Sequence, residues 1–136
     1  MNLKSAIALT ASLGVASFAL AADVDTSKLP APSTKTGLTF ATDIKPIFDA
    51  SCIKCHGAQK PKAKLSLDSL AGTLKGSENG KVIEPGKSEK SVLVLNIAHL
   101  GDEDDFMPPP KNKMGLKKLT DDQIGLVRAW IDQGAK

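Results

Sequence analysis

The chain has 136 residues and a formal net charge of +3, from 18 basic and 15 acidic side chains. A chain of this length is expected to form one small domain. All but one of the basic residues are lysines, and they are not clustered with arginine or aromatic residues, so we expect no nucleic-acid partner. Four Phe, one Trp and no Tyr leave the domain few aromatic side chains for its core.

The first residues have the pattern of a secretory signal peptide. Lys4 precedes an apolar stretch, residues 6–20, and Ala19-Leu20-Ala21 has the small residues of a cleavage site. We therefore predict a signal peptide at residues 1–21 and a periplasmic or otherwise exported protein, with no stable membrane insertion after cleavage. The alternative is a retained anchor, although polar residues dilute the apolar stretch.

A flexible linker is predicted at residues 22–37. This segment contains Pro30, Pro32 and several Ser, Thr and Lys residues, but almost no large apolar side chain. The domain itself is expected to span residues 38–136.

The first half of the domain is predicted to contain two helices. Thr42 or Asp43 would cap the first helix, and Pro46 is acceptable in its first turn. Phe48 lies on the side of this helix that is expected to face a cofactor or the core. Asp68 would cap a second, shorter helix, marked by a series of leucines.

The second half is predicted to contain two more helices. Ser88 would open the third, whose apolar residues fall on one side. Thr120 and Gln123 form a capping box at the start of the last helix, which would end at Gly134. Its apolar stripe consists of Ile124, Val127 and Ile131, with Trp130 beside it. No strand-rich region is found, so the fold class is predicted to be all-α.

Both cysteines lie in the motif Cys52-Ile53-Lys54-Cys55-His56. C-x-x-C-H is the signature of covalent c-type haem attachment. On one helix, positions i, i+3 and i+4 share a face, so the two thiols and the imidazole would converge. Cys52 and Cys55 would bind the haem vinyl groups, and His56 would bind the iron. The sequence therefore predicts one covalently bound haem c, with helices and long loops wrapped around it to complete the core.

The motif has three other interpretations: a redox disulfide, a structural zinc site, and a chance occurrence of two buried thiols beside a surface histidine. A redox disulfide between Cys52 and Cys55 is typical of a βαβ context, which the flanking sequence lacks. A structural zinc site needs four ligands, and beyond the motif the chain offers only the distant His99. An exported protein would normally oxidise such a cysteine pair, but the following histidine favours capture by haem.

The second axial ligand has three candidates. Met107 directly precedes three prolines, which favour an extended, stiff segment suited to hold a thioether in place. Met114 lacks such support, and His99 lies at a helix end, where contact with the last carbonyls is the simpler expectation. An open or water-bound site is the remaining alternative. We favour Met107, because Met/His coordination is typical of electron transfer.

The second ring nitrogen of His56 is also expected to have a partner. Metal-bound imidazoles usually donate this N–H to a carbonyl or carboxylate. The loop after the motif is the nearest source, and Pro61 is the candidate carbonyl.

With these motifs in hand, the stretch from about residue 40 to residue 135 resembles class I c-type cytochromes and, more narrowly, the planctomycete-type cytochrome c domain. The resemblance rests on the haem motif and on short motifs in the family's order: Ile44-x-Pro46-Ile47, Leu65-Ser66-Leu67-Asp68, Pro85-Gly86-x-Ser88, Ser91-x-Leu93, Met107-Pro108-Pro109, Leu119-Thr120-Asp121-Asp122-Gln123, Trp130-Ile131 and Gly134-Ala135. It implies a monohaem fold in which Cys52, Cys55 and His56 bind haem and Met107 is the axial ligand.

The expected function is that of a small exported electron carrier, not an enzyme. The alternative is a haem enzyme or a gas-sensing haem protein with an open distal site. Redox proteins are the expected partners. Their docking faces would be acidic if the lysines around the motif form a basic rim: Lys54, Lys60, Lys62 and Lys64.

Overall fold

The structure, a computed structural model, describes residues 24–136. The predicted signal peptide lies outside the described residues. Residues 24–136 contain five α-helices: α1 (Lys45–Ser51), α2 (Ile53–His56), α3 (Leu70–Lys75), α4 (Val92–Ala98) and α5 (Asp121–Asp132). Single turns of other helix types add η1 (Thr26–Lys28), η2 (Phe40–Ile44), η3 (Lys62–Lys64), η4 (Ser88–Lys90) and η5 (Glu103–Asp105).

Within residues 24–136 there is no β-strand, and the only ladder contact is an isolated bridge between Ser77 and Gly80. The predicted all-α class is therefore confirmed. None of the helices described in this part of the chain is long and apolar enough to cross a membrane.

The core forms where α1 and η2 meet α5. Its largest fully buried side chains are Trp130, Phe48, Ile44, Ile124 and Ile131. The Phe40 ring lies 6.0 Å from Phe48 and 5.8 Å from Trp130, measured between ring centroids. Phe48 therefore packs within an aromatic cluster, as an ordinary core residue would.

The stripe predicted on the last helix is confirmed, because Ile124, Val127 and Ile131 are all fully buried. The Trp130 indole also has its polar group satisfied, since Nε1–H donates to the Lys136 carbonyl at 2.9 Å. Burial of these side chains fixes one face of α5 against the rest of the domain.

The predicted start of α5 is confirmed, because its capping residues are close in sequence and bond to each other. The Thr120–Gln123 capping box at α5 is present in both directions. At the other helices the predicted caps were wrong. Ser69, not Asp68, caps α3, and Thr39 caps the η2 turn that leads into α1.

The third helix also begins later than predicted. Ser88 lies in the η4 turn and its hydroxyl donates to Asp132, at 3.0 Å, and so does not cap a helix. The α4 helix starts after Ser91, whose hydroxyl accepts from the Glu84 N–H and donates to the Lys87 carbonyl. Tertiary partners for both serines explain the difference.

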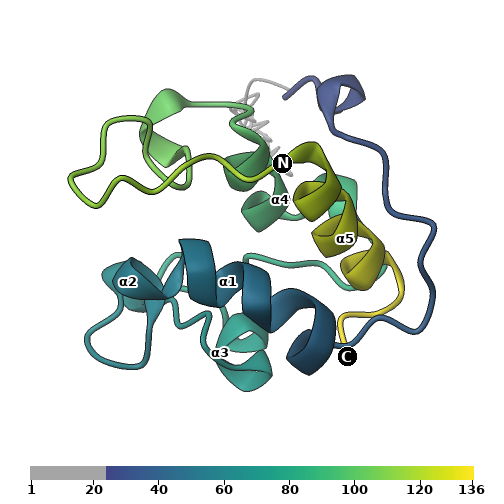
Figure 1. The fold of residues 1–136 in the computed structure, drawn as a ribbon, viewed down its shortest axis with the longest axis horizontal. Helices are drawn as coiled ribbons and strands as arrows, with labels where there is room; N and C mark the ends of the chain where they lie inside the picture. Colours follow the sequence, from purple (N-terminus) through teal and green to yellow (C-terminus); the bar gives the residue numbers. More distant parts are fainter. Residues whose placement is uncertain (1–23) are drawn as a thin grey trace, which may run out of the picture.

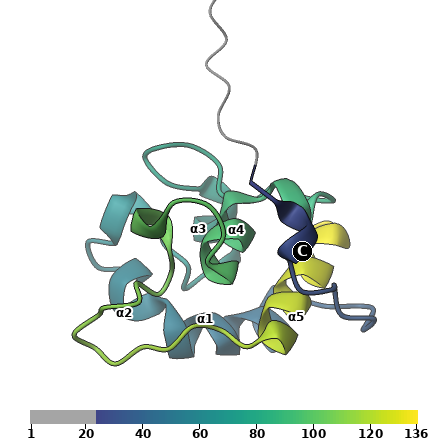
Figure 2. The same ribbon diagram turned by 90° about the horizontal axis from the view of Figure 1, so that it is seen from above.

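Residues 24–37, within the predicted linker, lie along α5 in both views (Figures 1 and 2). The Ser33 N–H donates to the Gly125 carbonyl at 2.9 Å, and Arg128 donates to the Pro30 carbonyl. Gly125 permits this close approach, because a Cβ there would lie only 2.7 Å from the Ala31 carbonyl oxygen. The segment therefore has specific contacts with the domain in spite of its polar composition.

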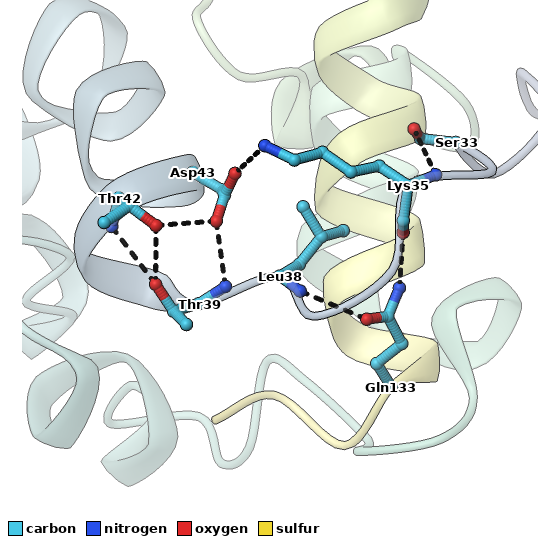
Figure 3. Close-up of polar contacts among 7 residues, drawn as sticks. All are labelled: Ser33, Lys35, Leu38, Thr39, Thr42, Asp43 and Gln133. Atoms are coloured by element: carbon cyan, nitrogen blue, oxygen red, sulfur yellow. Dashed lines mark hydrogen bonds and ion pairs between the residues drawn. The ribbon is translucent and has the colours of Figure 1, made fainter.

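Where this segment enters the first helix, Asp43 is the centre of a polar cluster (Figure 3). Its carboxylate accepts from the Thr39 N–H at 2.9 Å and from the Thr42 hydroxyl at 2.7 Å, and it pairs with the Lys35 ammonium. These donors, Lys35 first, lower the pKa of Asp43 from 3.8 to about 2. Asp43 thus supports the helix start from inside its first turn, while Thr39 is the cap.

We expect the Asp43→Asn variant to be less stable than the wild type near neutral pH. A lowered carboxyl pKa stabilises the fold above the unfolded value of 3.8, and this contribution is lost as the pH falls through about 2. The difference in unfolding free energy between variant and wild type should therefore shrink between about pH 4 and pH 2 in urea titrations.

The matched control is Asp49→Asn. Asp49 makes an exposed i,i+4 ion pair with Lys45 at 2.8 Å, a type of contact that contributes little. It should cost less stability than Asp43→Asn near neutral pH. A pH-independent difference between the Asp43 variant and the wild type would contradict the role assigned to the carboxylate.

Candidate cofactor site

The C-x-x-C-H motif lies at a break between two helices. The α1 helix ends at Ser51, and Cys52 has non-helical backbone angles (φ −122°, ψ −41°). The prediction of one continuous helix through the motif was therefore wrong. The turn still closes, because the Cys52 carbonyl accepts from the N–H groups of Cys55, at 3.1 Å, and His56, at 2.9 Å.

His56 is buried, with 9% of its surface exposed. Its Nδ1–H donates to the Leu65 carbonyl at 3.2 Å. The prediction that Pro61 provides this carbonyl was therefore wrong. The η3 turn reverses the chain after Pro61 and brings Leu65 back to the ring; the Leu67 N–H also donates to the His56 carbonyl at 2.7 Å.

These contacts leave His56 in a state that is suited to bind a metal ion. Burial, the largest influence, lowers the pKa of its imidazole and so favours the neutral ring. Because a carbonyl can only accept, the proton is on Nδ1, which leaves Nε2 with a free lone pair. A hydrogen bond of this kind is the usual second partner of a metal-bound histidine.

Met107 lies in the long loop between η5 and α5, followed by a cis peptide bond to Pro108. Its N–H donates to the Asn96 carbonyl at 3.0 Å. The side chain is partly buried and packs against the core. The loop is therefore tied to α4 at the residue predicted to be the second axial ligand.

One cavity lies between these segments. It is lined by Cys52, Cys55, His56 and Met107 together with mostly apolar neighbours: Leu65, Leu67, Val82, Leu93, Asn96, Ile97, Pro108, Pro109 and Leu116, among others. Its volume is about 840 Å³ when the part open to solvent is included, and about 180 Å³ of it is open to the centres of water-sized molecules. The α2 helix and the loop after η5 lie at the same end of the molecule in both views (Figures 1 and 2).

The other two candidates for the second ligand are not among the residues that line the cavity. Met114 is 49% exposed. The His99 ring bonds through Nε2 to the Pro108 carbonyl, 3.1 Å away. Of the three candidates, the structure brings only Met107 to the cavity that holds the motif.

The alternatives for the two thiols find little support. Both cysteines are free. Burial, and to a smaller extent the neighbouring Cys55, raises the pKa of the Cys52 thiol to about 12, which opposes the thiolate that metal binding and disulfide exchange need. Within residues 24–136, no three His, Cys, Asp or Glu side chains gather as the ligands of one ion.

The donor set and the cavity fit a haem. Two thiols and a neutral imidazole line a largely apolar cavity, and the thioether of a distant segment lines it too. These are the groups that c-type haem requires, in surroundings that exclude water from its ring.

Several residues of the cavity were missed by the sequence analysis. Leu93, Asn96 and Ile97 all face it from α4. Their i, i+3, i+4 spacing places them on one side of a helix, so the pattern was present in the sequence. The spacing alone does not show whether that side of the helix faces the core or a cofactor.

A helical domain, a C-x-x-C-H motif and a methionine at the same cavity are the features expected of a c-type cytochrome domain. The family model described as planctomycete cytochrome C matches residues 52–111, a range that includes Cys52, Cys55, His56 and Met107. Residues 52–111 are thus similar to a planctomycete-type cytochrome c domain. A match to this family supports a haem-binding protein that functions in electron transfer. No curated protein and no solved structure matches the chain significantly.

Proposed function

We propose that this protein is an exported monohaem c-type cytochrome that carries single electrons between redox partners. Cys52 and Cys55 attach one haem c, and His56 and Met107 are the axial ligands of its iron. The observation that carries the proposal is that these four side chains, from two distant segments, line one apolar cavity.

The bound haem supplies one-electron chemistry at its iron. The chain contributes ligands that are already oriented: His56 is held in one tautomer by the Leu65 carbonyl, and Met107 is tied to α4 through its N–H. With His56 and Met107 both holding the iron, the haem would not be open to oxygen or a substrate. This arrangement favours an electron carrier over an enzyme or a gas sensor.

Export is proposed from the sequence of residues 1–21, which has the three regions of a signal peptide. An exported location is consistent with thioether formation, because c-type maturation takes place where cysteine pairs would otherwise oxidise.

The test is a spectrum of the protein produced with cytochrome-maturation machinery. The ferrous protein should show a low-spin haem that carbon monoxide does not alter rapidly at neutral pH. Haem should also stay with the chain in denaturing electrophoresis. Rapid binding of carbon monoxide would favour the alternative of an open distal site, and a chain without covalent pigment would contradict the proposal altogether.

The docking face for redox partners is proposed to be the mouth of the cavity. Residues 54–64 and 111–118 flank it from the motif side and the Met107 side, and neither segment contains an acidic residue. Their lysines are all exposed: Lys54, Lys60, Lys62, Lys64, Lys111, Lys113, Lys117 and Lys118. Lys64 pairs with Glu78 at 3.4 Å, and the other lysines form a basic rim. A basic rim of this kind attracts an acidic partner and steers its approach.

Ionic strength should reveal this rim with small charged redox reagents. Oxidation of the ferrous protein by anionic hexacyanoferrate(III) should slow several-fold as salt is raised, because screening weakens the attraction. Oxidation by a cationic cobalt complex should show the opposite trend. Stopped-flow measurements of both rates provide the comparison.

In the double variant Lys54→Glu/Lys60→Glu the salt dependence with the anionic reagent should weaken or reverse. The control Lys87→Glu/Lys90→Glu has the same net charge but changes exposed lysines at η4, beside α5. If both double variants alter the salt dependence equally, net charge and not a local rim determines the rates.

A further inference from the structure

His99 occupies a backbone position at which glycine is the usual residue. It follows the last residue of α4 with left-handed angles (φ 57°, ψ 48°). The next residue closes the turn, because the Leu100 N–H donates to the Leu95 carbonyl at 2.9 Å. Glycine adopts this conformation without a steric cost at helix C-termini, whereas a histidine does not. Because His99 departs from the preference for glycine at this position, its side chain is expected to make a compensating contact.

The His99 ring makes two contacts, both with the loop that carries Met107. It stacks on the Phe106 ring, with centroids 4.7 Å apart and planes inclined by 9°. Its Nε2–H donates to the Pro108 carbonyl at 3.1 Å. The ring thus touches the residue before Met107 and the residue after it.

Met107 is consequently held at three adjacent points by the C-terminal turn of α4. Its own N–H donates to the Asn96 carbonyl, and its two neighbours contact the His99 ring. Asn96 also lines the cavity. The segment of α4 that lines the cavity therefore also anchors the loop that carries Met107.

We infer that His99 is a positioning residue for the axial ligand Met107: its ring clamps Phe106 and Pro108 and thereby keeps the thioether at the iron. This inference rests on the proposed function, because it assumes that Met107 is a ligand. It assigns His99 a role that differs from direct ligation, since its Nε2 is engaged by a carbonyl.

The test is the His99→Gly variant, with imidazole as a competitor for the Met107 position. Glycine suits the left-handed backbone, so the unfolding midpoint of the haem-loaded protein should change little. The ferric protein should nevertheless bind imidazole about tenfold more tightly, because a hydrogen bond and a ring stack no longer hold the loop. The methionine–iron charge-transfer band should also weaken, and the reduction potential should fall.

Phe106→Leu provides a second variant that removes the stack and leaves His99 in place. It should raise imidazole affinity in the same direction by a smaller factor, so the inference can be tested even if the glycine variant folds poorly. Unchanged imidazole affinity in both variants, with covalent haem and the methionine band intact, would overturn the role of His99 but leave the proposed function standing. A wild-type protein that lacks the methionine band would instead contradict Met107 ligation itself.

Discussion

The Met107→Ala variant is expected to retain covalently attached haem but to bind carbon monoxide rapidly in the ferrous state. Alanine removes the thioether, while Cys52, Cys55 and His56 are unchanged. The ferric spectrum should become high-spin or change on addition of exogenous ligands, and the reduction potential should fall, since a methionine ligand raises it. Carbon monoxide association should be at least about tenfold faster than in the wild type.

The matched control for this variant is Met114→Ala. Met114 is a methionine of the same loop, but it is 49% exposed and is not among the residues that line the cavity. Its loss should leave the spectrum and the potential at their wild-type values. A wild-type spectrum in Met107→Ala would mean that a different residue is the second ligand, and a changed spectrum in Met114→Ala would identify it.

The His99→Gly and Met107→Ala variants distinguish a residue that positions the ligand from the residue that is the ligand. Loss of Met107 removes the methionine–iron band completely, whatever happens to the loop. Loss of the His99 ring leaves the thioether available, so the band should weaken in proportion to the time that the loop spends away from the iron. Exogenous ligands would then compete with Met107 in the histidine variant, whereas they would bind without competition in the alanine variant.

The sequence predicted those features that local chemistry determines. The capping box at Thr120 and the buried stripe on α5 follow from side chains within two turns of one helix. The all-α class follows from the spacing of apolar residues. Residues Cys52, Cys55 and His56 could be chosen because thioether and imidazole chemistry requires these residue types in that order.

The sequence-based predictions were wrong where the partner of a side chain depends on how the chain folds back in space. Ser88 was predicted to cap a helix, but its hydroxyl bonds to Asp132 on α5. Pro61 was chosen as the partner of His56 because it is close in sequence, yet the η3 turn presents Leu65 instead. His99 was judged as a ligand or as an ordinary helix-end residue. Its contact with Pro108 depends on the return path of the loop after η5, which the sequence pattern does not encode.

The double variant Cys52→Ala/Cys55→Ala is expected to lose covalent haem completely and most of its folded structure. Without thioethers, no pigment should follow the chain in denaturing electrophoresis. The cavity between α2, α4 and the Met107 loop would keep its mostly apolar walls with nothing bound to fill it. The domain has few aromatic side chains to compensate, and a group that binds only the folded state stabilises it by its binding free energy.

Circular dichroism and limited proteolysis should therefore show reduced helix content and rapid cleavage of the double variant. The wild-type chain produced without maturation machinery is the matched control, because it lacks the same haem but keeps both thiols. If the two apoproteins are equally unstable, the missing haem accounts for the loss. A stable double variant would show that the core formed by Trp130, Phe48 and Ile124 supports the fold without haem. Single variants, each with one possible thioether, should lie between these limits, because one covalent bond still keeps haem at high effective concentration beside His56.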